Sequence, residues 1–253
     1  MGQAHIIGTY KADDRSTVRL VEHGGRRWIV KHYHGGPIRT ALYHLFRATP
    51  AWREVRAATM LAAAGVRVNR PMLLRHLRGR GQSGQLLVLA YAPGRSLYHE
   101  LFGDAPPDRR DRARQAQRLR IARGVGTQIA RMFAAALVNR DHKASNLIVD
   151  ELARECADGP VLIDPVGVTR SDDMRRFARM LLTLLRSSYA AGGATRRERL
   201  TVLLMATRQL EPTRRASHDR AIALMRWLDS ELGTPPPKKP DRRPADHPTR
   251  QSL

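Results

Sequence analysis

The chain has 253 residues, of which 42% are hydrophobic and 27% are charged, a composition typical of a soluble globular protein with one large domain or two small lobes. A single cysteine, Cys156, excludes an internal disulfide and a thiolate metal cluster, and suits a reducing cytoplasm. No apolar run is long enough to span a bilayer, and we predict no signal peptide.

The net charge of +22 would attract nucleic acid, anionic lipid or phosphorylated glycans. Arginine is spread over nearly every segment, so the charge alone favours none of these partners. Aromatic residues make up only 5% of the chain, which argues against a base-stacking platform. We therefore expect no specific nucleic acid partner.

Strands are predicted over residues 4–10, 16–21 and 27–33, separated by polar or Gly-rich turns. The third strand carries Lys31, and a helix that begins after Thr49 and Pro50 carries Glu54. In kinases a strand lysine, held by a glutamate on a helix, contacts the α- and β-phosphates of ATP. Taken alone, each residue is more commonly a surface residue.

Two more strands are predicted over residues 66–77 and 85–91. The second is a continuous apolar run that reaches Ala90 and Tyr91 before an Ala-Pro-Gly turn. In a two-lobed kinase the chain crosses between the lobes here, and the backbone of these two residues would hydrogen-bond adenine. A plain strand and turn would have the same sequence.

A long basic helix is predicted over residues 106–136, with an apolar stripe and eight arginines from Arg109 to Arg131. It leads into the segment Asn139–Val149, N-R-D-H-K-A-S-N-L-I-V. If the acceptor lies at an anionic membrane, we expect arginines of this helix, such as Arg110, Arg114 and Arg118, to face it.

Asp141, Lys143 and Asn146 have the spacing of the kinase catalytic loop, H-R-D-x-x-x-x-N, with Asn139 in place of the histidine. Phosphoryl transfer needs a carboxylate that accepts the proton of the attacking hydroxyl, a cation that neutralises the moving phosphoryl group, and an amide oxygen on a metal ion. A solvated loop before a strand is the alternative, so the rest of the chain must supply the partners.

Asp164 ends the apolar strand V-L-I-D-P-V-G, where a carboxylate beside Asn146 would complete an oxygen-ligand site for Mg²⁺. Protein kinases have Asp-Phe-Gly here, whereas this chain has a glycine only at position 167. Only about eight residues precede the next helix cap, too few for an activation segment switched by phosphorylation, which disfavours a peptide substrate.

The last part of the chain is predicted to be helical and then disordered. Amphipathic helices are predicted over residues 172–186, 195–210 and 217–232. The Pro-rich basic tail over residues 234–253 cannot bury a core and is predicted to be disordered.

Six residues in order are far more specific than any one of them: Lys31, Glu54, Asp141, Lys143, Asn146 and Asp164. With them the chain resembles the eukaryotic-like kinase superfamily and, within it, the bacterial lipopolysaccharide kinases that phosphorylate Kdo or heptose of the inner core. Three segments carry the closer resemblance over residues 5–190: D-R-S-T-V-R-L at 14–20, similar to the R-x-T segment of that family, W-R-E-V at 52–55 and A-G-V at 64–66.

The resemblance implies an α+β, two-lobed protein-kinase-like fold. A small antiparallel sheet lobe with one helix would span residues 1–91, and a mainly helical lobe with the catalytic loop would span 92–233. ATP and magnesium would bind between them, with Lys31 and Glu54 as an ion pair in a cleft that Asp164 also lines. Asp141 would be the base, Lys143 would neutralise the phosphate, and Asn146 and Asp164 would hold the metal.

The resemblance also implies a partner and a location. The acceptor would be a sugar hydroxyl of an anionic glycolipid, and the protein a cytoplasmic monomer, with peripheral association at the inner face of the cytoplasmic membrane.

Two other classes stay open. One is a serine/threonine-type protein kinase or small-molecule kinase of the same fold, and the other is a pseudokinase scaffold or basic nucleic-acid-binding protein. Retention of all six groups disfavours a pseudokinase, and a nucleotide-dependent thermal shift that salt does not change would disfavour a polyelectrolyte binder.

Overall fold

The computed structural model describes residues 3–34, 49–77, 84–103, 111–155, 158–188, 193–208, 211 and 213–232. The chain forms two compact units. Of the described residues, unit 1 contains those up to Arg56 together with Asn69–Tyr91, and unit 2 contains Ala57–Val68 together with those from Ala92 to Leu232. The predicted first lobe, residues 1–91, included Ala57–Val68, which cluster with unit 2. Cys156 and the predicted tail lie outside the described residues.

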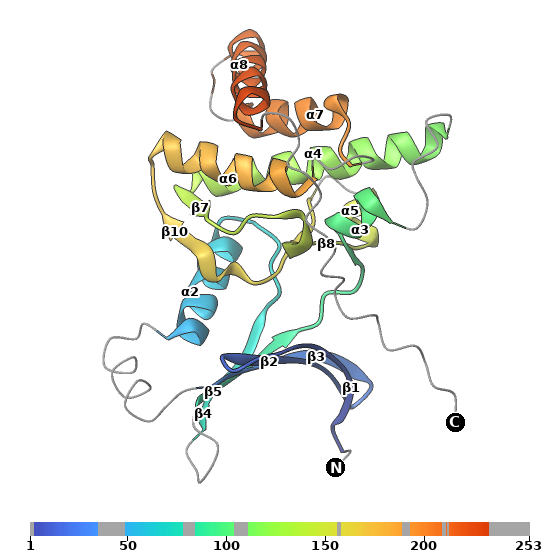
Figure 1. The fold of residues 1–253 in the computed structure, drawn as a ribbon, viewed down its shortest axis with the longest axis vertical. Coiled ribbons are helices and arrows are strands. Elements are labelled where there is room, and N and C mark those ends of the chain that lie inside the picture. Colours follow the sequence, from blue (N-terminus) through green and yellow to red (C-terminus); the bar gives the residue numbers. More distant parts are fainter. Residues whose placement is uncertain are drawn as a thin grey trace. The chain divides into compact units, whose positions relative to one another are not determined.

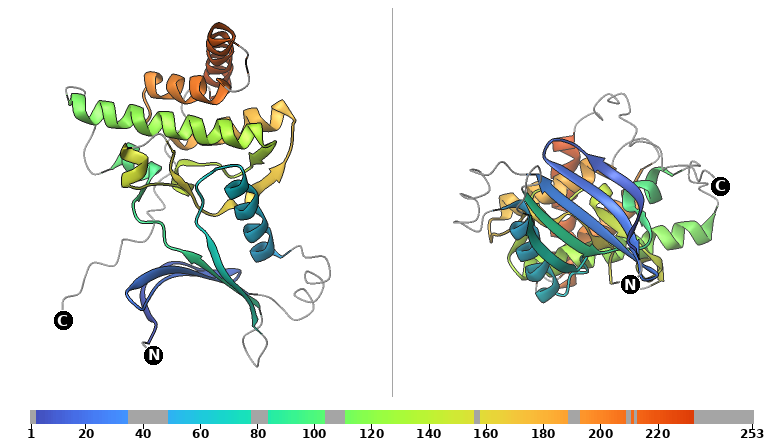
Figure 2. Two further views of the ribbon diagram at one scale, coloured as in Figure 1. Left: turned by 180° about the vertical axis from the view of Figure 1, so that it is seen from behind. Right: turned by 90° about the horizontal axis from the view of Figure 1, so that it is seen from below.

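Unit 1 contains a five-stranded antiparallel sheet of order β1-β2-β3-β5-β4 (Figures 1 and 2). Its strands are β1 (His5–Ala12), β2 (Ser16–His23), β3 (Arg26–His34), β4 (Pro71–Leu77) and β5 (Gly84–Ala90). The turn between β2 and β3 uses Gly24 and Gly25 at φ 60° and 69°, because two-residue hairpin turns need positive φ. The strand predicted from residue 66 begins only at Pro71.

Helix α2 (Pro50–Ala63) begins and ends where its sequence signals predict. The side chain of Thr49 accepts a hydrogen bond from the N–H of Trp52 at 3.2 Å, as an N-cap residue does. Gly65, at φ 69°, follows its end. The small core of unit 1 combines this helix with one face of the sheet through Ala51, Val55, Ile29, Leu87 and Leu89.

Unit 2 is mainly helical. Its helices are α3 (Leu97–Phe102), α4 (Arg112–Ala134), α5 (Glu151–Glu155), α6 (Met174–Ser188), α7 (Arg196–Thr207) and α8 (Arg214–Leu232). Helices α4, α6, α7 and α8 confirm the four long helices that the sequence predicts after residue 106. The short helices α3 and α5 were not predicted. Figure 1 shows α7 lying against α4. Gly126 permits this approach, since a Cβ there would lie 2.6 Å from the backbone oxygen of Val202.

Short strands and turns in unit 2 hold the polar segments. They are β6 (Arg95–Ser96), β7 (Leu137–Asn139), β8 (Leu147–Val149), β9 (Val161–Leu162), β10 (Val168–Arg170) and the 3₁₀ turns η1 (Ala144–Asn146) and η2 (Pro165–Gly167). β10 pairs with β7, and β8 lies between β6 and β9. The hydrophobic core of unit 2 includes side chains from these strands and from α4 and α6 that are fully buried: Ile129, Met132, Leu147, Leu162 and Phe177.

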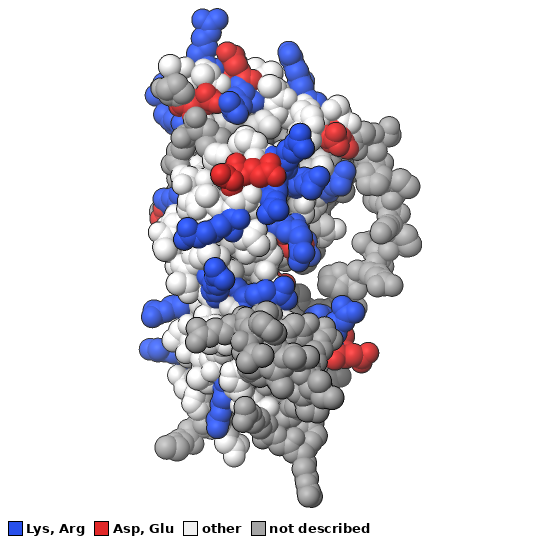
Figure 3. Space-filling view, turned by 90° about the vertical axis from the view of Figure 1, so that its left-hand side faces the viewer, with Lys and Arg blue, Asp and Glu red and all other residues white. Residues whose placement is uncertain are grey.

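Basic side chains are dispersed over the face of the molecule that Figure 3 shows. On the side of the molecule in Figure 3, Lys and Arg side chains are scattered over the described surface and do not gather into a single patch. No described helix is both long enough and apolar enough to cross a bilayer.

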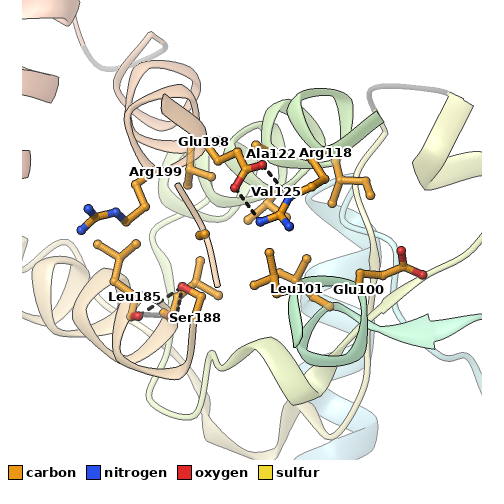
Figure 4. A pocket seen from close by; sticks show the side chains of 14 residues that line it. Glu100, Leu101, Arg118, Ala122, Val125, Leu185, Ser188, Glu198 and Arg199 are labelled. Atoms are coloured by element: carbon orange, nitrogen blue, oxygen red, sulfur yellow. Dashed lines mark hydrogen bonds and ion pairs between the residues drawn. The ribbon is translucent and has the colours of Figure 1, made fainter. Parts of the chain in front are cut away.

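Arg118 on α4 does not face solvent. Its side chain is 8% exposed. Its Nε donates to Glu198 Oε1 at 2.6 Å, and its Nη2 donates to Glu198 Oε2 at 3.0 Å and to the carbonyl oxygen of Gly193 at 2.8 Å (Figure 4). The expectation that this arginine faces a membrane is wrong, because it forms a bidentate pair inside the helical unit.

We expect Arg118→Met to lower the free energy of unfolding by about 3–5 kcal/mol, because it leaves the carboxylate of Glu198 buried without its cation. Urea unfolding measures this loss. In the double variant Arg118→Met/Glu198→Leu the loss should be largely recovered, since no buried charge remains. Equal stabilities of the single variant and the wild type would contradict the argument.

Candidate active site

The loop between β7 and β8 brings together the three polar residues that the motif predicts. Nζ of Lys143 lies 3.2 Å from Oδ2 of Asp141. Nδ2 of Asn146 donates to the backbone oxygen of Asp141 at 3.0 Å and to its Oδ2 at 3.3 Å. The side chains of Asp141 and Lys143 are 46% and 41% exposed, whereas Asn146 is buried. A carboxylate, an ammonium and an amide therefore meet at a place that a solute can reach.

Backbone hydrogen bonds hold this loop. The N–H of Lys143 donates to the carbonyl oxygen of Asp141 at 3.0 Å, and the N–H of Asn146 donates to that of Lys143 at 2.9 Å. The N–H of Ala144 donates to Oγ of Ser187 on α6 at 2.8 Å. Exposed ion pairs contribute only about 0–1 kcal/mol, so these bonds fix the loop and the pair of Asp141 and Lys143 does not.

Asn139, which replaces the histidine of the kinase motif, is fully buried. Its Oδ1 accepts the N–H of Asp141 at 3.1 Å, and its own N–H donates to Sδ of Met180 at 3.2 Å. An asparagine often bonds the backbone two residues ahead in this way. The departure from the motif thus leaves a side chain that orients the backbone of Asp141.

His142, which the sequence analysis passed over, is fully buried next to Asp141. Burial lowers its pKa to about 4, against the opposing effect of the Asp141 carboxylate. Neither ring nitrogen has a hydrogen-bond partner among the described residues. The ring is therefore neutral near pH 7, and its full burial keeps it from a substrate, which leaves Asp141 as the base candidate of this segment.

Asp164 follows β9 and has left-handed backbone angles, φ 53° and ψ 56°. This region is uncommon for residues other than glycine, and such strain is concentrated at functional sites. The preceding residue, Ile163, donates its N–H to the carbonyl oxygen of Asn146 at 2.8 Å. That bond joins the segment of Asp164 to the catalytic-loop segment.

Gly167 packs directly against the catalytic-loop segment. The N–H of Arg140 donates to its carbonyl oxygen at 3.2 Å. A Cβ at this position would lie 2.8 Å from Oδ1 of Asn139 and 3.2 Å from the backbone nitrogen of Asp141. The glycine therefore stands one residue later than in Asp-Phe-Gly because close approach requires it at 167.

We expect Gly167→Ala to lower the turnover number more than the affinity for ATP, because the added methyl group displaces the turn that orients Asp141. The loss of stability should be about 1–3 kcal/mol, as for other overpacked sites. Steady-state kinetics and urea unfolding measure the two effects. Gly8→Ala is the control, since its Cβ would make only an ordinary contact, 3.9 Å from Cβ of Leu20. Wild-type turnover in Gly167→Ala would contradict the assignment.

Asn146 and Asp164 suit a magnesium ion. Because Nδ2 of Asn146 is bonded to Asp141, its amide oxygen is the atom left for a ligand. A carboxylate and an amide oxygen are hard ligands, and Mg²⁺ usually binds one or two such groups together with waters and phosphates. Within the described ranges no group of three or more His, Cys, Asp or Glu could hold a metal. The two side-chain oxygens of Asn146 and Asp164 fit a metal that is also bound by phosphate oxygens and waters.

In unit 1 the predicted ion pair is present. Nζ of Lys31 lies 2.7 Å from Oε1 of Glu54, with side chains 9% and 0% exposed. Tyr33, which the sequence analysis missed, donates its hydroxyl to Oε2 of Glu54 at 2.5 Å. Its position two residues after Lys31, on the same face of β3, could have indicated it. That Asp164 lines the same cleft stays a prediction.

A buried ion pair of this kind is weak evidence for stability, because apolar residues of similar volume often replace such pairs without loss. Perturbed or buried charges with specific partners are instead common at functional sites. The pair of Lys31 and Glu54 is thus a candidate binding group of unit 1.

The predicted adenine contact falls on the end of β5. Ala90 pairs with Trp28, and its N–H donates to the carbonyl oxygen of Arg70 at 2.8 Å. That N–H is therefore already used within the sheet. Tyr91 follows the strand and is half-buried, so its backbone is the better candidate of the two, and its role stays a prediction.

The turn between β1 and β2 stands where protein kinases have a glycine-rich loop, and it is built differently. Nζ of Lys11 lies 2.8 Å from the carboxylate of Asp13, which also accepts the N–H groups of Arg15 and Ser16. The pKa of Asp13 is lowered to about 2, mainly by the hydrogen bond from Lys11 and to a smaller extent by the backbone hydrogen bonds. An ionised aspartate thus holds the turn in place of glycine.

Comparisons with known proteins show the fold. No family model matches the chain, and no curated protein matches it. Among solved structures, WaaP in complex with acyl carrier protein matches with a TM-score of 0.59 and 19% sequence identity, over 88% of this chain and 86% of that one. The structure and this likeness confirm the predicted α+β, two-lobed, protein-kinase-like fold.

Proposed function

We propose that the chain is an ATP-dependent phosphotransferase that phosphorylates a sugar hydroxyl of a lipopolysaccharide core, Kdo or heptose. The observation that carries the proposal is the convergence of Asp141, Lys143 and Asn146 on one loop, joined by a backbone hydrogen bond to the segment of Asp164. Phosphoryl transfer depends mainly on positioning and on charge stabilisation, and these groups supply both.

Asp141 accepts the proton of the attacking sugar hydroxyl at its carboxylate. Lys143, 3.2 Å away, neutralises negative charge on the transferred phosphoryl group. Lys31, oriented by Glu54 and Tyr33, contacts the α- and β-phosphates of ATP. The bond from oxygen to the γ-phosphorus forms as the bond to the β-phosphate oxygen breaks, and ADP leaves.

ATP and Mg²⁺ are the proposed cofactors. Asn146 and Asp164 hold the metal by their side-chain oxygens, and the backbone of Ala90 and Tyr91 is proposed to lie against adenine. When bound, the metal ion neutralises phosphate charge and orients the phosphates. The left-handed backbone of Asp164 fixes the direction in which its carboxylate leaves the chain.

A sugar acceptor is supported by the short segment after Asp164. Residues 165–170 form η2 and β10, and α6 begins at Met174. β10 pairs with β7, where Val168 is opposite Asn139. Residues 165–170 therefore pack against the start of the catalytic-loop segment and form no long activation segment. The fold likeness to WaaP is compatible with a lipopolysaccharide acceptor.

The location proposed is the cytoplasm, at the inner face of the cytoplasmic membrane, where a glycolipid acceptor would be found, and the protein is proposed to act as a monomer. A net charge of +22 favours an anionic acceptor such as a phosphorylated glycolipid. The same charge also attracts nucleic acid, so the acceptor must be tested directly.

The test is transfer of labelled phosphate from ATP to a panel of acceptors. The panel contains Kdo- and heptose-terminated core oligosaccharides, a generic protein substrate and small alcohols, each with and without Mg²⁺. We expect labelling of the core sugars, dependent on Mg²⁺. Labelling of only the protein or the small alcohols would replace the proposed acceptor, and no labelling together with no binding of ATP would reject the enzyme proposal.

A further inference from the structure

The two faces of the sheet in unit 1 can be assigned from the register. Residues directly opposite each other in antiparallel strands point to the same side. Val30 is opposite Arg19 and Val88, and Val88 is opposite Leu73, so all four share one side. Lys31, the next residue along β3, points to the other side, toward Glu54 on α2.

Applied to all strands, the register defines what we call the open sheet face, the side that carries Val30. Its large apolar residues are Ile6, Val21, Trp28, Val30, Leu73, Leu77, Leu86 and Val88, and its arginines are Arg19, Arg26 and Arg75. In the five described strands the one acidic residue is Glu22, which is opposite His5 and Arg27 and so points to the other side.

Among the described residues of unit 1, no helix packs on the open sheet face. Helix α2 packs on the opposite face, against Leu87 and Leu89, and the right-hand view in Figure 2 shows the strands of this sheet turned toward the viewer. Ile6 and Leu73 are 58% and 51% exposed, and Trp28 is half-buried. None of the apolar residues of this face belongs to a hydrophobic core cluster of the described residues.

A contiguous apolar patch on a soluble protein marks an interaction surface. The chemistry of this one fits an anionic lipid bilayer. The arginines of this face match phosphate headgroups, a tryptophan suits the membrane interface, and aliphatic side chains of Ile6 and Leu73 match the acyl boundary. With one tryptophan, it offers no series of aromatic rings for nucleic acid bases. A second copy would place Arg19, Arg26 and Arg75 against their equivalents without an acidic partner.

We propose that the open sheet face docks the protein on an anionic bilayer, with Ile6, Trp28 and Leu73 at the lipid interface and the arginines on the headgroups. The inference rests on the proposed function only in that a glycolipid acceptor is membrane-borne. It differs from the expectation that arginines of the helix predicted over residues 106–136 make this contact, of which Arg110 lies outside the described residues. Arg118 of that helix is buried on Glu198.

The test is co-sedimentation of the full chain with vesicles of phosphatidylglycerol and phosphatidylcholine at physiological salt. The variant Ile6→Asp/Leu73→Asp changes two exposed side chains of this face. The control variant, Leu152→Asp/Met174→Asp, changes two exposed side chains of unit 2, 55% and 38% exposed, and alters the net charge equally. We expect the first variant to lose about tenfold or more in vesicle affinity, since each charge at an anionic surface changes binding by roughly fivefold, and the control to lose much less.

A second measurement follows the fluorescence of Trp28 in a variant with Trp52→Phe and Trp227→Phe. A blue shift on addition of vesicles is expected as the ring leaves water. Equal loss of vesicle affinity in both double variants, or no shift of Trp28, would overturn the proposal. The proposal would also be overturned if the wild type did not bind vesicles but bound RNA through this face. Dimerisation through this face, detected by light scattering, would overturn it as well.

The outcome is separable from that of the proposed function. Transfer to a soluble core oligosaccharide should be the same in Ile6→Asp/Leu73→Asp and the wild type, because neither residue belongs to the candidate active site. If the wild type binds vesicles through this face but transfers no phosphate, the docking surface stands and the proposed function fails.

Discussion

Asp141→Asn is expected to lower phosphoryl transfer by about 10²–10⁴-fold, the usual contribution of a general base, while the affinity for ATP changes little. The amide cannot accept the proton of the attacking hydroxyl. The fold should survive, because the Asp141 side chain is 46% exposed and its ion pair with Lys143 is exposed as well. Transfer of labelled phosphate and calorimetric titration with ATP measure the two quantities.

The matched control is Asp158→Asn. Asp158 lies in the same unit, 65% exposed, and pairs with Arg131 at 3.5 Å, so its replacement removes one negative charge without touching the candidate site. Turnover in Asp158→Asn should equal that of the wild type. Wild-type turnover in Asp141→Asn would refute the assignment of the base, because no other carboxylate of the described catalytic-loop segment could take its place.

Asp164→Asn is expected to weaken binding of the complex of Mg²⁺ and ATP by at least about 10–100-fold, the loss found even for groups one layer behind a metal. The affinity for ATP without metal should stay the same. Asparagine, like aspartate, tolerates the left-handed backbone that Asp164 has, φ 53°. The substitution therefore tests the carboxylate and leaves the backbone strain unchanged.

Asp164→Gly separates the charge from the backbone. Glycine adopts positive φ without strain, so this variant should unfold at higher urea concentration than Asp164→Asn. It should nevertheless bind the metal complex as poorly, because both variants lack the carboxylate. Thermal shifts with ATP, with and without Mg²⁺, report the binding. A metal-dependent shift retained in both variants would exclude Asp164 as a metal ligand.

Local signals in the sequence determined the order of the elements and most of the candidate site. Alternation and the glycine pair at 24 and 25 indicated the strands of the sheet, and Thr49 and Gly65 indicated the limits of α2. The spacing of Asp141, Lys143 and Asn146 is a property of one short loop, so the motif alone predicted that these side chains would meet. The pair of Lys31 and Glu54 followed from a kinase pattern in which a strand and the next helix supply one residue each.

Where the sequence prediction failed or was silent, the contacts are long-range. Arg118 was placed at the surface because it is one of eight arginines on a basic helix, yet its partner, Glu198, lies 80 residues away. No local pattern shows that a distant carboxylate will be buried beside it. Likewise, the departure at Asn139 could be judged only once Gly167 and Met180 were seen to pack around it.

The sequence by itself thus determined which chemical groups the chain carries and in what order, because spacing within a strand, a helix or a loop fixes local geometry. The tertiary structure decided which of those groups are exposed. Strand register places Ile6, Trp28 and Leu73 on the same side of the sheet as Arg19, Arg26 and Arg75. It places Glu22 on the opposite side. Alternation within each strand cannot specify this, since a shift of one residue between two strands would reverse their relative faces.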